Sequence, residues 1–261
     1  MGIKGAILGD IIGSKWEFCG CKDPYKVELF DDKNFFTDDT ILSCATKYAI
    51  DNNISFESAY RAFSEKYLHY YYGAGWGNNF KKWITREDHK QSFGNGSAMR
   101  VGYIGDYFDS ISDVVDMAKE SAKTTHDTED GVNGATAVAF MCYFAKHQKR
   151  SGTELQVIKE ILMHYCDYVY PDYAGWTLND YRNNYRWSCS CKKSVHIAVR
   201  CIYESNSFEE CMRNVLSIYC DADTICAIAG SIAEHIFGLP EYADEKLNYY
   251  LDAFLCSVVY S

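Results

Sequence analysis

Apolar residues in this 261-residue chain recur mostly at intervals of three and four positions, the period of an α-helix. Only three prolines interrupt the pattern, at Pro24, Pro171 and Pro240. The pattern therefore predicts an all-α protein. Helices are expected over residues 39–50, 56–72, 111–123, 130–147, 153–168, 193–204, 208–219, 222–237 and 243–258.

A further helix is expected at the start of the chain, where Gly5, Gly9 and Gly13 follow one another at four-residue spacing. Such a stripe of glycines lets a helix pack closely against a neighbour. Glu17 comes one turn after Gly13, so the same helix would carry it on the inward face. A buried carboxylate needs a partner, which could be a metal-bound water or an arginine, unless Glu17 is exposed near the helix end.

Small residues are also concentrated in the helices expected over 130–147 and 222–237, where we expect close packing in the core. By contrast, residues 169–191 are rich in tyrosine and tryptophan and lack clear periodicity. We expect them to form a long aromatic loop that either packs on the surface or forms the wall of a cleft.

Composition favours one domain over residues 1–261, because no proline-, glycine- or serine-rich linker divides the chain. No apolar run approaches the ~18 residues that span a bilayer, and the first residues do not resemble a signal peptide. A cytoplasmic location is therefore expected, with the 12 cysteines reduced. The formal charge of -10 disfavours nonspecific attraction to nucleic acid or to an anionic membrane, although a local basic groove stays open.

Two acidic clusters lie near opposite ends of the chain, Thr37–Thr40 (Thr-Asp-Asp-Thr) and Asp221–Thr224 (Asp-Ala-Asp-Thr). Each opens a predicted helix. Either cluster alone is explained by helix N-capping, for which Asp and Thr are ordinary residues. Together they offer the hard oxygen ligands that suit magnesium or manganese better than zinc. A divided metal site requires that the two ends of the chain meet.

The segment Gly94–Arg100 (Gly-Asn-Gly-Ser-Ala-Met-Arg) contains two glycines and an asparagine, which permit positive backbone φ angles. Its amide groups could then point into one concavity and bind phosphate, although an ordinary turn is an open alternative. Arg100 would contact phosphate or form a salt bridge beneath the loop.

His126 lies just before the helix expected over 130–147, near the positive end of its dipole. This position suits a contact to phosphate or ribose, while a solvated or capping histidine is the alternative. No pairing of serine with histidine and aspartate, or of cysteine with histidine, indicates nucleophilic catalysis.

Taken in chain order, these segments resemble the ADP-ribosylglycohydrolase family of the dinitrogenase-reductase-activating glycohydrolase type. The resemblance spans nearly the whole chain and includes the tail Ile225–Glu234 with Gly238–Pro240. It implies a compact all-helical domain with a central cleft that holds two divalent cations, Mg²⁺ or Mn²⁺.

The resemblance also assigns roles at the metal site. Glu17 would gate or complete the site, and Asp223 could bridge the two ions. Glu17, or a ligand carboxylate such as Asp38, would act catalytically by taking the proton of the attacking water. The implied metal ligands are Thr37, Asp38, Asp39, Asp221, Asp223 and Thr224.

The implied substrate-binding residues lie on the loop and just before the helix at 130. His126 matches the family histidine near the distal part of ADP-ribose. The loop that would hold the diphosphate consists of Gly94, Asn95, Gly96 and Ser97.

This chain departs from the family pattern in three places. Tyr219 and Cys220 replace two glycines before the second acidic cluster, Asp127–Asp130 lacks the usual Pro-Glu, and His196 follows Ser194 and Val195 where proline is common. All proposed ligands are retained, so these departures affect the expected fit of the substrate more than metal binding.

The resulting hypothesis is a hydrolase that cleaves the bond at the anomeric carbon of ADP-ribose. Its substrate would be an ADP-ribosylated protein or a small ADP-ribose conjugate, with ADP-ribosylated nucleic acid not excluded. The alternatives are a noncatalytic ADP-ribose-binding or structural relative, and a two-metal phosphoesterase.

Overall fold

The computed structural model describes residues 2–69, 75–85 and 91–261. Within these ranges the chain is helical and contains no β-strand, which confirms the all-α class. The α-helices are α1 (Lys4–Gly13), α2 (Asp38–Asp51), α3 (Phe56–Tyr67), α4 (Asn78–Ile84), α5 (Gly102–Tyr107), α6 (Ile111–Lys123), α7 (Glu129–Arg150), α8 (Leu155–Val169), α9 (Leu178–Asn184), α10 (Cys191–Tyr203), α11 (Phe208–Leu216), α12 (Ala222–Phe237), α13 (Ala243–Tyr250) and α14 (Ala253–Val259).

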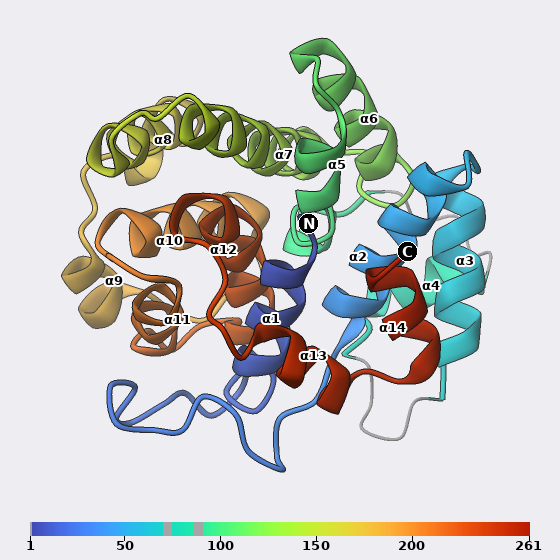
Figure 1. Cartoon of the computed structure of the whole chain (residues 1–261), viewed down its shortest axis with the longest axis horizontal. Helices are drawn as coiled ribbons and strands as arrows, with labels where there is room; N and C mark the ends of the chain where they lie inside the picture. The colour runs from blue at the N-terminus through green and yellow to red at the C-terminus, as the bar shows by residue number, and fades with distance from the viewer. Residues whose placement is uncertain (1, 70–74, 86–90) are drawn as a thin grey trace.

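The core is organised around α12, which packs against α1, α7, α10 and α11. Every residue of α12 from Ala222 to Glu234 is buried, so this helix is enclosed on all sides. Figure 1 shows α1 and α12 together near the middle of the molecule, with α2 on one side and α10 and α11 on the other. The first and the last thirds of the chain therefore share one core.

The glycines of α1 make the close packing against α12 possible. A Cβ at Gly9 would lie 2.0 Å from the carbonyl oxygen of Cys226, and one at Gly13 would lie 2.3 Å from that of Ala222. The backbones thus meet where any side chain would collide. This confirms the close packing expected of the first helix and brings the starts of α2 and α12 together.

The expectation that Glu17 extends this helix is wrong, because α1 ends at Gly13. The Asn34 amide donates to the carbonyl of Ile11 at 2.7 Å, and the Ser14 hydroxyl donates to the same carbonyl at 2.9 Å. These side chains satisfy the carbonyl groups left free at the helix end. Glu17 therefore lies in the turn that follows α1.

The helix expected over 243–258 is two helices, α13 and α14. Asp252 separates them, since its carboxylate accepts the amide of Leu255 at 2.9 Å and caps α14. The expected aromatic loop over 169–191 also contains structure, because a 3₁₀ turn at Pro171–Tyr173 and helix α9 lie within it. Thr177 and Asp180 form a capping box at the start of α9.

Other helix boundaries differ by a few residues. Helix α3 ends at Tyr67, and residues 70–72 of the helix expected over 56–72 lie outside the described residues. The short helices α4 and α5 were not expected. All 12 cysteines are free thiols. Across the described ranges, no helix combines the length and the apolar character needed to cross a bilayer.

Candidate functional site

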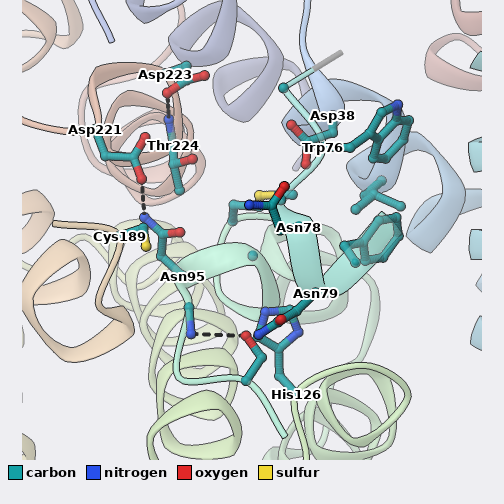
Figure 2. Close-up of a pocket in the computed structure, with 18 of the residues that line it drawn as sticks. Asp38, Trp76, Asn78, Asn79, Asn95, His126, Cys189, Asp221, Asp223 and Thr224 are labelled. Atoms are coloured by element: carbon teal, nitrogen blue, oxygen red, sulfur yellow. Dashed lines mark hydrogen bonds between the residues drawn. The ribbon is translucent and has the colours of Figure 1, made fainter. Parts of the chain in front are cut away.

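A cavity of about 520 Å³ opens where the starts of α2 and α12 meet the loop before α5. Figure 2 shows Asp221, Asp223 and Thr224 of α12 on one side and Asp38 with Trp76 on the other. His126 lies at the far end. The two acidic clusters thus share one cavity, as the divided-site hypothesis requires.

Carboxylates in this region form two overlapping groups. One consists of Asp10, Asp39 and Asp223, and the other of Glu17, Asp221 and Asp223. Within each group the oxygen atoms lie within 4.8 Å of one another, close enough to bind one cation. Asp223 belongs to both groups and is placed to bridge two sites.

A direct contact joins the two ends of the chain. The Thr224 hydroxyl donates to Asp39 Oδ2 at 3.3 Å, and the Thr37 hydroxyl lies 3.2 Å from the same oxygen. Thr37 and Thr224 are both buried beside Asp39. Sequence order separates these residues widely, but the packing of α1 against α12 brings them into contact.

Asp10 holds the start of α2 in place. Its carboxylate accepts the Thr37 amide at 2.8 Å, the Thr37 hydroxyl at 2.7 Å and the amide of Thr40 at 3.1 Å. It also accepts the Thr40 hydroxyl at 2.5 Å. Sequence reasoning missed Asp10, although a signal was present, because it is the one charged residue in the apolar run from Gly5 to Gly13.

Asp39 Oδ1 provides the test of whether a cation fits this site. The atom is buried and accepts no hydrogen bond from the described residues. A buried carboxylate oxygen without a partner is costly, and a divalent cation would supply the missing partner. The carboxylate and hydroxyl oxygens around it are ligands that hard cations prefer. The residues therefore fit a metal ion.

The electrostatics of the cluster lead to the same conclusion. Burial raises the pKa of Asp10 to about 6, and it raises the pKa values of Asp39 and Asp223 well above their usual range. Repulsion among the neighbouring carboxylates adds to the effect of burial. A bound cation would offset the cost of burying these negative charges and would reduce the repulsion between them.

Asp38 lies apart from the two carboxylate groups. It lines the cavity beside Trp76, and its pKa is raised by burial and by the charge of Asp10. Its oxygens do not belong to either group of closely spaced ligand atoms. The role of Asp38 as a ligand and catalytic residue therefore stays a prediction.

Glu17 reaches the cavity from the turn after α1. Burial raises its pKa to about 8, and the charges of Asp221 and Asp10 contribute. Two hydrogen bonds fix the turn from outside, since the Trp187 indole donates to the Glu17 carbonyl at 3.0 Å and the Tyr219 hydroxyl donates to the Phe18 carbonyl at 3.3 Å.

These contacts explain one of the departures from the family pattern. Tyr219 lies at the rim with 54% of its surface exposed, whereas Cys220 is fully buried. Neither residue lines the cavity. Tyr219 therefore supports the Glu17 turn and does not narrow the cleft. Trp187 belongs to the aromatic segment 169–191, for which the wall of a cleft was one of two expected places, and it does line the cavity.

Gly94, Asn95 and Gly96 line the cavity, whereas Ser97 is fully buried and does not. The loop lacks the positive φ angles expected of a phosphate nest. Its last three residues form a 3₁₀ turn, and Gly94 has a φ of -72°. The glycines are needed for a different reason. A Cβ at Gly96 would lie 3.3 Å from His126 Nε2, so a larger residue would press on that ring.

Polar side chains of this loop donate hydrogen bonds to other segments of the chain. The Asn95 amide donates to Asp221 Oδ2 at 2.8 Å and to the Ser194 hydroxyl at 2.9 Å. The Ser97 hydroxyl donates to the Gly131 carbonyl at 2.8 Å. Asn95 thereby links the loop to the acidic cluster and orients Asp221.

Arg100 is buried beneath the loop with 1% of its surface exposed. It makes no ion pair with the described residues, so the salt-bridge alternative is wrong, whereas contact with phosphate stays a prediction, since Arg100 also lines the cavity. Its guanidinium donates to the Ser121 carbonyl at 3.0 Å and to the Thr125 hydroxyl at 2.8 Å, and it lies 4.2 Å from the centre of the Tyr60 ring.

The sequence of this chain is similar to a known protein family and to named proteins. A model of the family described as ADP-ribosylglycohydrolase matches residues 2–247. Human ADP-ribosylhydrolase ARH3 is 24% identical over 310 aligned residues, covering 92% of this chain and 85% of that protein. ADP-ribosylhydrolase ARH3 from Xenopus tropicalis is 30% identical over 172 residues, covering 55% of this chain and 49% of that protein.

A solved structure has the same fold. The chain described as an ADP-ribosylglycohydrolase-related protein complex superimposes with a TM-score of 0.66 at 17% identity. The match covers 98% of this chain and 96% of that chain.

Proposed function

The chain belongs to the ADP-ribosylglycohydrolase family, and from this premise we propose that it is a metal-dependent hydrolase of the bond at the anomeric carbon of ADP-ribose. Its substrate is an ADP-ribosylated protein side chain or a small ADP-ribose conjugate. The cations are Mg²⁺ or Mn²⁺, both of which accept oxygen ligands.

The observation that carries this proposal is the meeting of the two acidic clusters at Asp39, whose Oδ1 is a buried oxygen without a hydrogen-bond partner among the described residues. One ion would be held by Thr37, Asp39 and Asp223, and the other by Asp221, Asp223 and Thr224, with Asp38 at the cavity wall. Positive charge develops on the ribose as the bond breaks, and bound cations would orient the ribose hydroxyls and lower the pKa of the attacking water.

Glu17 is the side chain best suited to move a proton. Without a cation the pKa of Glu17 is raised to about 8, and a carboxyl group with a raised pKa can accept a proton and return it. In the proposed reaction, its carboxylate takes a proton from the water that attacks the anomeric carbon, and this proton passes to the leaving atom as the glycosidic bond breaks. The hydrogen bonds from Trp187 and Tyr219 hold Glu17 at the cavity for this purpose.

The rest of the cavity binds the nucleotide part of the substrate. The Gly94–Ser97 loop lies beside His126, which is at the end of the cavity away from α12, and Asn95 reaches from this loop to Asp221. The diphosphate would lie along the loop, and the anomeric carbon would lie near the acidic cluster. Asn95, which contacts Asp221, couples the position of the loop to that of the ligands.

The experiment is a panel of ADP-ribosylated arginine peptide, ADP-ribosylated serine peptide and ADP-ribosylated DNA, assayed with Mg²⁺ or Mn²⁺ and with chelator. We expect release of ADP-ribose from at least one substrate and loss of release with chelator. Asp223→Asn should lower the rate roughly 100-fold or more, whereas the exposed Asp116→Asn should leave it unchanged.

The same panel tests the alternatives. Tight binding of ADP-ribose without release from any substrate would indicate a noncatalytic relative. Release of phosphate from ADP-ribose itself would indicate a phosphoesterase.

A further inference from the structure

Three buried side chains form a hydrogen-bonded row behind the Gly94–Ser97 loop. Arg100, Thr125 and His126 expose 1%, 2% and 6% of their surfaces. Arg100 Nη2 donates to the Thr125 hydroxyl at 2.8 Å, and that hydroxyl lies 2.7 Å from His126 Nδ1. The far nitrogen of the ring, Nε2, faces the loop at the cavity.

The direction of the second hydrogen bond follows from proton counting. A guanidinium only donates, so Thr125 Oγ1 accepts from Arg100 and still has one proton to give. Within the described ranges, His126 Nδ1 is the acceptor available to that hydroxyl. If Nδ1 carried a proton instead, the buried Thr125 proton would have no acceptor, which is costly.

The charge state of the ring is set by the same neighbours. Burial lowers the pKa of His126 to about 3, and the positive charge of Arg100 contributes. The ring is therefore neutral at physiological pH. A neutral imidazole with Nδ1 acting as an acceptor must carry its proton on Nε2.

We propose that Thr125, held by Arg100, is a positioning residue that fixes His126 as the neutral tautomer with its proton on Nε2. His126 then presents a neutral N–H donor to an oxygen of the bound ligand, a diphosphate or ribose oxygen of ADP-ribose. The identity of this ligand rests on the proposed function, whereas the tautomer is a property of the protein alone.

This arrangement has a consequence for binding. An ordinary histidine would gain a proton in mildly acidic solution and then attract the diphosphate more strongly. His126 donates the same hydrogen bond without taking up a proton. Gly96 leaves room for the ring, because a Cβ at this position would lie 3.3 Å from Nε2.

The first test uses nitrogen NMR of protein labelled at its histidines, seven in all. His126→Gln identifies the signals of His126. We expect the chemical shift of an N–H nitrogen for Nε2 and that of a bare nitrogen for Nδ1, unchanged between about pH 5.5 and 8. A proton on Nδ1, or on both nitrogens at neutral pH, would overturn the proposal, and this test needs no variant of Thr125.

The second test measures the role of Thr125 by titrating the protein with ADP-ribose. Thr125→Val should produce a mixture of His126 tautomers and weaken ADP-ribose binding about three- to tenfold. Thr125→Ser keeps the hydroxyl and should restore both. The neighbouring Thr124→Val is the matched control, because the Thr124 hydroxyl bonds the Glu120 carbonyl on its own helix.

The two tests separate this proposal from the proposed function. Unchanged affinity in Thr125→Val would overturn the positioning role. If the wild-type protein has the expected tautomer but does not bind ADP-ribose, the proposed function fails and the tautomer assignment stands.

Discussion

At the scale of single residues, Asp10 shows how a side chain outside the obvious motif organises the site. Its carboxylate accepts both the amide and the hydroxyl of Thr37 and of Thr40. Because the Thr37 hydroxyl gives its proton to Asp10, one of its lone pairs accepts the backbone amide of Asp39 at 3.3 Å and the other is left for a cation. Asp10 thus prepares Thr37 as a ligand before any metal binds.

Replacing Asp10 tests this preparation. In Asp10→Asn one carboxylate oxygen becomes an NH₂ group, which cannot accept from Thr37 or Thr40. We expect the affinity for Mn²⁺, measured by calorimetric titration, to fall about 10- to 100-fold. Asp116→Asn is the control for an exposed aspartate. If Asp10→Asn bound Mn²⁺ as well as the wild type, Asp10 would have only a structural role.

The sequence identified part of this site for clear physical reasons. Thr37, Asp39, Asp223 and Thr224 belong to compact acidic clusters at helix starts, and the structure brings them together. Asp10 was missed because a single aspartate in an apolar helix has no local pattern. Of the two alternatives left open for the segment Gly94–Arg100, the structure has the turn and not the nest, since Asn95–Ser97 form a 3₁₀ turn without positive φ angles and Gly96 packs closely against His126.

At the scale of elements, the contact between α1 and α12 positions the whole site. Glycines at four-residue spacing could be recognised in the sequence, so close packing of the first helix was expected, although its partner was not named. The end of α1 was not, because it depends on Asn34, a residue from a distant segment that binds the Ile11 carbonyl. The break between α13 and α14 likewise depends on capping by Asp252.

A methyl group at Gly9 should disrupt this contact. In Gly9→Ala the new Cβ would lie 2.0 Å from the Cys226 carbonyl oxygen, so the two helices must separate. We expect the free energy of unfolding in urea to fall by about 3 kcal/mol. Gly77→Ala has nothing within 4 Å of its Cβ and should cost less than about 1 kcal/mol. Equal losses in the two variants would show that the contact is not tight.

The turn that carries Glu17 is the second element that can be tested. Trp187→Phe keeps an aromatic ring but removes the donor to the Glu17 carbonyl. We expect faster hydrogen exchange at the amides of Cys19 and Gly20, which both bond the Trp16 carbonyl. We also expect kcat to fall about three- to tenfold with little change in KM.

Tyr219→Phe removes the other hydrogen bond to this turn and should act in the same direction. Trp176→Phe, in the segment before α9, is the matched control and should leave exchange at Cys19 and Gly20 unchanged. Unaltered exchange in both Trp187→Phe and Tyr219→Phe would show that the turn is held by other contacts.

At the scale of the whole molecule, the fold encloses a cluster of carboxylates whose charge opposes folding when no cation is bound. Burial raises the pKa of Asp10 to about 6 and that of Glu17 to about 8. The folded protein therefore holds more protons than the unfolded chain above about pH 4, and this contribution to stability is lost as the pH rises through these values. Below about pH 6.5 the lowered pKa of His126 has the opposite effect, because the unfolded chain then binds the extra proton and stability increases as the pH rises.

The metal-free protein should accordingly become less stable as the pH rises from about 6.5 to about 8.5. Thermal unfolding in chelator should give a lower Tm at the higher pH, and saturating Mn²⁺ should raise Tm most there. In Glu17→Gln the Tm of the metal-free protein should depend less on pH, because this variant lacks the group with the pKa of about 8. A metal-free Tm that rises over this interval would contradict the electrostatic account.

The central claim is that carboxylates from the two ends of the chain enclose divalent cations. Anomalous diffraction from a crystal grown with saturating Mn²⁺ tests it most directly. We expect one peak between Asp39 and Asp223 and a second beside Asp221, each at bonding distance from carboxylate oxygens. Density that shows these side chains well ordered, with no manganese between Asp39 and Asp223, would contradict the account.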